Sequence, residues 1–221
     1  MIVMSVKVGL KFIEKWKTDL EKQVCNYEAE NAAPGQIVFY GPSNFTRWST
    51  KYGMIPLREV LVGKSGAPCC VNRGFGSTCS EHHLYYYHRM VKPLAPKVLV
   101  YFPGIGNGLS FGYTPEEQWE MAQRVMVYAK ADFPDLRIYL CGINLYKASK
   151  GSRYEINKQF DGWLQDFAKE LPDCTYVNLT DYEPLHRDDI YVEDNVHYNQ
   201  EGYHIYGDFF KEVLKDELAQ F

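Results

Sequence analysis

The chain has 221 residues, which is enough for one α/β domain with a full-sized core or for two small domains. Its hydrophobic fraction of 46%, its charged fraction of 24% and its formal net charge of -4 are those of an ordinary soluble globular protein. This composition excludes a strong basic field of the kind that attracts nucleic acid or an anionic membrane, so we expect neither as a partner.

The start of the chain predicts an amphipathic helix ahead of the first strand. Lysines interrupt its apolar pattern, whereas a secretory signal and a membrane span both need an uninterrupted apolar run. We therefore expect residues 1–30 to be a helical extension of a single domain that covers residues 1–221, with no membrane span. A cytoplasmic location follows, unless an export signal has been removed. The apolar residues at helical spacing are Val8, Phe12, Ile13, Trp16, Leu20 and Val24.

Short apolar runs alternate with longer stretches of helical periodicity along the rest of the chain. Such alternation predicts an α/β fold, a parallel sheet of about five strands with helices on both faces. In such sheets, the loops at the carboxyl ends of the strands form the ligand crevice. The apolar runs cover 36–41, 69–74, 97–104, 137–143 and 175–179, and the helical stretches cover about 78–92, 114–131, 153–171 and 199–219.

The cysteines and histidines give no indication of a metal site. None of the six cysteines forms a C-x-x-C pair, and buried free thiols behave as small apolar groups. His82, His83 and His88 have no acidic or cysteine ligand at site-like spacing nearby. We expect these histidines to form one solvated, partly aromatic helix face, and we expect no metal and no cofactor.

The loops that follow the apolar runs carry the residue types of acyl transfer. Ser43 follows the first run, glycine-rich backbone follows the second and third at 74–78 and 103–108, and Asp194 and His197 follow the last. A serine becomes a good nucleophile when a histidine takes its proton, and the histidine needs an orienting carboxylate. Each residue alone is commoner as a turn, a cap or a packed side chain. Their order, Ser…Asp…His, is that of other α/β serine hydrolases.

Four sequence blocks, in order along almost the whole chain, resemble those of the SGNH hydrolases, also called GDSL-type esterases and lipases. GPSNFTRW is similar to the family's G-D-S followed by a tryptophan, and VNRGFGST to its N-R-G-F-G-G-S-T. YFPGIGNG is similar to its G-x-N-D, and DNVHYNQEGY matches its D-x-x-H-x-N-x-x-G-Y in full. The resemblance implies a three-layer α/β/α sandwich with flavodoxin-like topology, in agreement with the independent strand count.

The resemblance also implies a catalytic triad and an esterase activity. Ser43 would be the nucleophile, His197 the general base and Asp194 the residue that orients it, although Pro42 replaces the family's aspartate beside the nucleophile. The expected substrate is a small or medium carboxylic ester, such as an acetylated carbohydrate or a short acyl ester, cleaved through an acyl-enzyme. Two alternatives stay open: an acyltransferase that uses the same site, and a binding protein or pseudoenzyme on the same fold.

The resemblance also implies an oxyanion hole, and two of its positions differ from the family's sequence pattern. Its donors would be the backbone N–H of Ser43, the backbone N–H of Gly76 or Ser77, and the side-chain amide of Asn107. Ser77 stands where the family has glycine. In the third block a second register puts Gly106 in the place of the asparagine. We favour Asn107 because it is the only amide there and the oxyanion needs a donor.

Overall fold

The computed structural model describes residues 13–221, with side chains described from residue 19 onward. At its centre is a five-stranded sheet whose paired strands all run parallel, in the order β2-β1-β3-β4-β5. The strands are β1 (Ile37–Gly41), β2 (Cys70–Gly74), β3 (Val98–Tyr101), β4 (Arg137–Cys141) and β5 (Cys174–Val177).

Helices of very different length connect these strands. The longer helices are α1 (Ile13–Ala29), α4 (Ser80–Met90), α6 (Pro115–Asp132), α8 (Tyr154–Glu170) and α9 (Gln200–Val213). The short helices are α2 (Ser43–Thr46), α3 (Leu57–Val60), α5 (Ile105–Ser110), α7 (Leu145–Ala148) and α10 (Lys215–Leu218), and three 3-10 turns are η1 (Thr50–Tyr52), η2 (Lys92–Leu94) and η3 (Glu183–His186).

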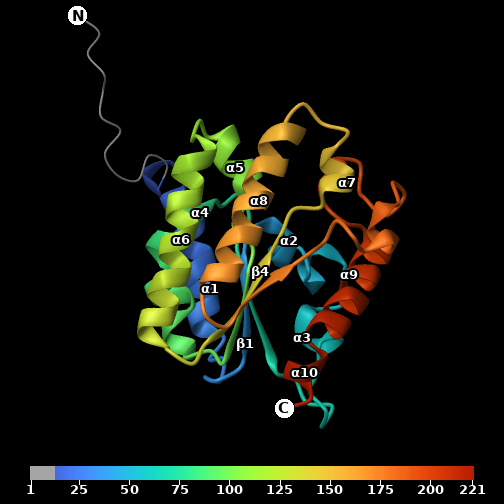
Figure 1. Ribbon diagram of the computed structural model, residues 1–221. Helices are drawn as coiled ribbons and strands as arrows, with labels where there is room; N and C mark the ends of the chain where they lie inside the picture. Colours follow the sequence, from blue (N-terminus) through green and yellow to red (C-terminus); the bar gives the residue numbers. More distant parts are fainter. Residues whose placement is uncertain (1–12) are drawn as a thin grey trace, which may run out of the picture.

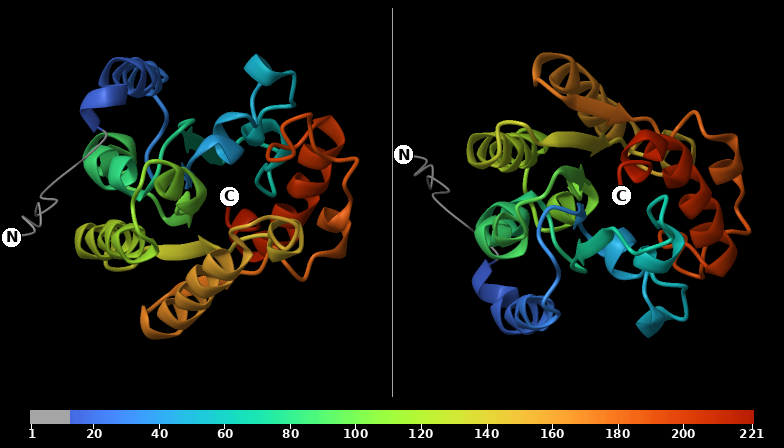
Figure 2. Two further views of the ribbon diagram at one scale, coloured as in Figure 1. Left: turned by 90° about the horizontal axis from the view of Figure 1, so that it is seen from above. Right: turned by 90° about the horizontal axis from the view of Figure 1, so that it is seen from below.

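The two faces of the sheet are covered by different sets of helices. Figures 1 and 2 show α1, α4, α6 and α8 on one side and α3, α9 and α10 on the other. Side chains of β1 alternate between the two layers, because successive residues of a strand point to opposite faces. Val38 and Tyr40 are buried in the first layer, and Ile37 and Phe39 in the second. The predicted three-layer α/β/α sandwich on a parallel five-stranded sheet is confirmed.

The predicted elements agree with the structure except at the C-terminus. Each predicted apolar run contains or overlaps a strand, and three of the predicted helices correspond to α4, α6 and α8. The single helix predicted over 199–219 was wrong, because Leu214 leaves helical geometry at φ -103 and ψ 12 and separates α9 from α10. This break lets both Leu214 and Leu218 reach the core beneath the second layer.

The N-terminal helix belongs to the first layer. Leu20 and Val24 are buried in the same cluster as the side chains of β1, and the hydroxyl of Tyr27 donates to the carbonyl of Gly74. The apolar positions Val8 and Phe12 of the predicted helix lie outside the described residues. The treatment of residues 1–30 as an extension therefore stays a prediction. Among the described residues, no helix is both long and apolar enough to cross a membrane.

The sheet order brings three loops together at its carboxyl edge, which is at the top of Figure 1. β1 lies between β2 and β3, so the chain leaves β1 to one side and later returns on the other, which is the switch point where α/β sheets bind ligands. Gly104, after β3, has φ +25, and a Cβ there would lie 3.0 Å from the carbonyl oxygen of Thr78 and 3.2 Å from Cγ of Pro42. Three loops therefore touch at Gly104.

Close packing at the end of β2 makes a direct prediction about stability. A Cβ on Gly74 would lie 2.5 Å from the backbone nitrogen of Thr46, so we expect Gly74→Ala to lower the free energy of unfolding by about 1–3 kcal/mol. Gly162, inside α8, is the matched control because a Cβ there meets nothing within 4 Å. Gly162→Ala should raise that free energy by about 0.5–1 kcal/mol. Urea unfolding of both variants measures the two effects. Equal free energies of unfolding for the two variants would contradict the close packing at Gly74.

Candidate active site

Ser43 is the first residue of α2, directly after β1 and Pro42. Two hydrogen bonds from distant elements fix this short helix. The side-chain amide of Asn72 on β2 donates to the carbonyl of Phe45 at 2.7 Å, and the hydroxyl of Tyr203 on α9 donates to the carbonyl of Asn44 at 2.8 Å. A four-residue helix has little stability of its own, so these tertiary contacts hold the serine in place.

Ser43, His197 and Asp194 form one continuous hydrogen-bonded chain. Nε2 of His197 lies 2.7 Å from Oγ of Ser43, and Nδ1 of His197 lies 2.7 Å from Oδ2 of Asp194. An ionised carboxylate only accepts hydrogen bonds, so Nδ1 carries the proton and Nε2 of the neutral ring accepts from the serine hydroxyl. This is the orientation that a general base needs to receive the serine proton.

The turn that carries Asp194 keeps its carboxylate ionised. Oδ1 accepts the backbone N–H groups of Val196 and His197, both at 2.9 Å. Burial raises the pKa of Asp194, but these hydrogen bonds and the one from the imidazole outweigh that effect, and its pKa falls to about 2. Nη1 of Arg47 lies 3.5 Å from Oδ2 and adds a positive charge. Asn199, and not Asp194, caps α9, by accepting the N–H of Gly202 at 3.0 Å.

The predicted oxyanion donors come from the loops after β1, β2 and β3. A Cβ placed on Gly76 would lie 4.0 Å from Cβ of Ser43, so the loop at Gly76 lies beside the serine. Ser77 has φ 59, a left-handed conformation that favours glycine. Asn107 lies in α5 and lines the same cleft as Ser43, with Nδ2 donating to the carbonyl of Thr78 at 2.8 Å.

A cleft of about 750 Å³ opens beside Ser43 at the carboxyl edge of the sheet. Apolar side chains that line it include Phe102, Ile143 and Leu179, after three different strands. Lys147, Lys150 and Asp188 also line it, and Nζ of Lys150 pairs with Oδ1 of Asp188 at 2.7 Å. A pocket that combines apolar side chains with polar and charged groups is suited to a small molecule that has both kinds of surface.

Solved structures with the same architecture carry hydrolase names. No family model and no curated protein matches the chain. A GDSL-like lipase from Bacteroides thetaiotaomicron is similar, with a TM-score of 0.69 at 18% identity over 89% of this chain and 97% of that chain. The chain has the fold of the SGNH hydrolases. A family 3 carbohydrate esterase from Clostridium thermocellum shares this SGNH fold, with a TM-score of 0.62 at 13% identity over 83% and 97% of the two chains.

A third neighbour with the SGNH fold comes from Streptococcus pneumoniae and is assigned as a platelet activating factor. It has a TM-score of 0.71 at 20% identity, over 94% of this chain and 97% of that chain. At such identities the likeness concerns the fold. The strand order β2-β1-β3-β4-β5 confirms the expected flavodoxin-like topology. The roles of individual side chains are argued from the geometry of this chain.

The expectation of a solvated histidine face was wrong. In this SGNH-fold chain His82 and His83 are fully buried in α4, and only His88 is exposed. The expectation that no acidic or cysteine ligand falls at site-like spacing nearby was wrong as well, because potential ligand atoms of Cys79, Glu81 and His82 lie within 4.8 Å of one another. Helix α4 packs against α1, α5 and α6 as well as lying over the sheet, which leaves little of its surface for solvent.

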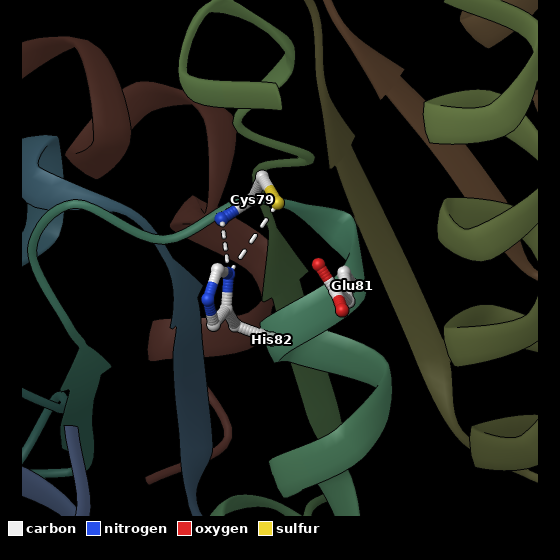
Figure 3. Close-up of side chains that lie close together, drawn as sticks. All are labelled: Cys79, Glu81 and His82. Carbon is white, nitrogen blue, oxygen red and sulfur yellow. Dashed lines mark hydrogen bonds between the residues drawn. The ribbon is translucent and has the colours of Figure 1, made fainter. Parts of the chain in front are cut away.

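The hydrogen bonds of this buried cluster identify it as a helix cap. Figure 3 shows the backbone N–H and the thiol of Cys79 both directed at His82, and Nδ1 of His82 accepts that N–H at 3.2 Å. Burial raises the pKa of the Cys79 thiol to about 12 and lowers the pKa of His82 to about 4. The carboxylate of Glu81 accepts from the hydroxyl of Tyr113. Both groups are therefore held in their neutral forms, and Nδ1 of His82 is used by the cap.

Sequence reasoning missed two residues that support the site. Thr78 accepts the hydrogen bond of Asn107, and Asn72 holds α2. Both lie inside the quoted block VNRGFGST, which was the available signal. Arg47 supports the site as well, because Nη1 lies 3.5 Å from Oδ2 of Asp194.

The pKa of Asp194 tests the geometry of the turn without any substrate. Carbon-13 NMR of its carboxyl group in an acid titration should give a pKa of about 2, well below the ordinary 3.8. His197→Phe removes the imidazole donor and leaves the two backbone donors, so the pKa should rise part of the way toward 3.8. An ordinary pKa in both proteins would contradict the hydrogen-bonded turn.

Proposed function

We propose that this protein is a serine esterase that hydrolyses small or medium carboxylic esters through an acyl-enzyme on Ser43. The observation that carries the proposal is the hydrogen-bonded chain from Ser43 through His197 to Asp194, with the serine lining a cleft large enough for such an ester. The GDSL-like lipase and the carbohydrate esterase that share the fold are named for the same class of reaction.

The geometry supports the following steps. Nε2 of His197 takes the proton of Ser43 as Oγ attacks the ester carbonyl, and the ionised Asp194 stabilises the imidazolium that forms. His197 then gives this proton to the departing alcohol oxygen, which leaves an acyl group on Oγ. Water attacks the acyl group with the same histidine as base, and the acid leaves.

The oxyanion would be held between two loops and the serine itself. The backbone N–H of Ser43, the backbone of Gly76 or Ser77 and the second amide proton of Asn107 are the available donors. One proton of the Asn107 amide is used on the carbonyl of Thr78, which fixes the plane of the group, and the other remains for the substrate. Preorganised donors of this kind lower the barrier because they need no reorientation during the reaction.

The cleft supports an ester with an apolar acyl part and a polar remainder. Phe102, Ile143 and Leu179 offer apolar contacts, while Lys150 and Asp188 offer charged hydrogen-bonding groups. An acetylated carbohydrate or a short acyl ester would suit this combination. Transfer of the acyl group to a hydroxyl instead of water would use the same first half-reaction.

Covalent labelling tests the nucleophile. An organophosphonate should modify the wild-type protein once, on Ser43, as located by mass spectrometry of the digested protein. Ser43→Ala should abolish labelling and lower kcat for a chromogenic short-chain ester by on the order of 10⁴–10⁶. Ser110→Ala, an exposed serine of α5, is the control and should retain both. If wild-type protein neither reacts nor turns over an ester, the pseudoenzyme alternative is correct.

Substitutions in α5 test the oxyanion donor. Asn107→Ala should lower kcat by roughly 10²–10³ with a smaller effect on KM, because the donor acts mainly on the developing oxyanion. Gly106→Ala should be tolerated, since a Cβ there meets nothing within 4 Å. Steady-state kinetics of the two variants separates the two registers of the third block. Loss of activity in Gly106→Ala with a neutral Asn107→Ala would show that the chosen register is wrong.

A further inference from the structure

A buried threonine helps to tie the loop beside Ser43 to the core. The hydroxyl of Thr78 donates to the carbonyl of Phe75 at 2.6 Å, which closes the loop around Gly76 and Ser77. The carbonyl of the same threonine accepts the side-chain amide of Asn107 at 2.8 Å. Thr78 is fully buried, so the bond from its hydroxyl to Phe75 lies out of competition with water.

A buried histidine orients the hydroxyl of Thr78. Nε2 of His83 lies 3.0 Å from Oγ1 of Thr78, and Nδ1 lies 3.3 Å from the hydroxyl oxygen of Tyr101. The single hydroxyl proton of Thr78 goes to Phe75, so Oγ1 can only accept the N–H of Nε2. A neutral imidazole has one N–H, so Nδ1 accepts from Tyr101. The donor direction therefore runs from Tyr101 through His83 to Thr78 and Phe75.

Aromatic packing keeps His83 neutral and in place. Its ring centroid lies 5.2 Å from that of Tyr40 on β1, 5.5 Å from that of Phe75 and 5.6 Å from that of Tyr101 on β3. The hydroxyl of Tyr40 donates to the carbonyl of His83 at 2.7 Å. Burial, with a smaller effect of His82, lowers the pKa of His83 well below its ordinary value, so the ring does not take up a second proton that would reverse the chain.

We propose that Thr78 and His83 are positioning residues of the oxyanion hole. The proposal rests on the proposed esterase function, and neither residue lines the cleft. The hydroxyl of Thr78 fixes the backbone of Gly76 and Ser77 from one side, and its carbonyl fixes the amide of Asn107 from the other. Two of the three donors then depend on one buried residue, the loop donor through its side chain and Asn107 through its backbone carbonyl. Aromatic rings from β1 and β3 pack around His83, which bonds the Thr78 hydroxyl.

The proposal is tested with variants that keep the shape of the core. Thr78→Val removes the hydroxyl and His83→Phe removes the N–H donor, and each should lower kcat for a chromogenic ester by roughly 10- to 10²-fold with little change in KM, because small displacements of reacting groups are costly. Thr78→Ser restores the hydroxyl and should recover most of this loss. Tyr87→Phe is the matched control, since it removes a hydroxyl of the same helix that bonds Asp132 at 3.1 Å. It should affect stability and leave kcat as in the wild type.

A second measurement does not need turnover. Amide hydrogen exchange at residues 76 and 77 should be faster in Thr78→Val and His83→Phe than in the wild type and in Tyr87→Phe. Thermal unfolding confirms that each variant is folded. Unchanged exchange, or a kcat that falls no more than in Tyr87→Phe, overturns the positioning role. If the wild type neither reacts with the label nor turns over an ester, the proposed function is overturned instead. The exchange rates then still decide whether the hydrogen bonds of Thr78 and His83 anchor the loop.

Discussion

The parallel pairing of β1 with both β2 and β3 is the constraint on which the rest of the structure depends. In register, Tyr40 of β1 stands beside Arg73 of β2 and Tyr101 of β3, so the three strands end at nearly the same level. Their loops must then share a small space, and only glycine fits where they meet, at Gly74 and Gly104. The nucleophile and the candidate oxyanion donors lie far apart in the sequence, but they are neighbours in space because they follow neighbouring strands.

The histidine reaches the serine by a different route. Helix α9 docks on the second face of the sheet, with Trp48, Tyr203 and Phe210 in one aromatic cluster. The hydroxyl of Tyr203 bonds the backbone of α2, and the turn before α9 carries Asp194 and His197. Packing of one helix therefore fixes the base against the nucleophile. Asp194 and His197 are three residues apart in one turn. Their distance to Ser43 is set by how α9 packs in the hydrophobic core.

Two buried histidines form hydrogen bonds that fix a helix end and a loop. His82 accepts a backbone N–H at the start of α4, and His83 joins Thr78 to Tyr101. Each ring satisfies a group that would otherwise be buried without a partner, His82 through Nδ1 at a helix end and His83 through both nitrogens between a loop and the sheet. The rigidity that results is located under the loop of residues 75–78, where the site needs it. Catalytic donors stabilise charge best when they are already fixed.

The sequence by itself determined the alternation of strands and helices, the parallel sheet and the order of Ser43, Asp194 and His197, because these depend on local periodicity and motif spacing. It could not decide that His82 and His83 are buried, because histidine and tyrosine suit both solvent and core, and only the contacts of α4 with α1, α5 and α6 settle their exposure. Short helices such as α2 and α5 gave no periodic signal. Tertiary structure alone decided the hydrogen bond between residues 43 and 197 and the anchoring of Asn107 on Thr78, since both join segments whose separation in space is set by packing.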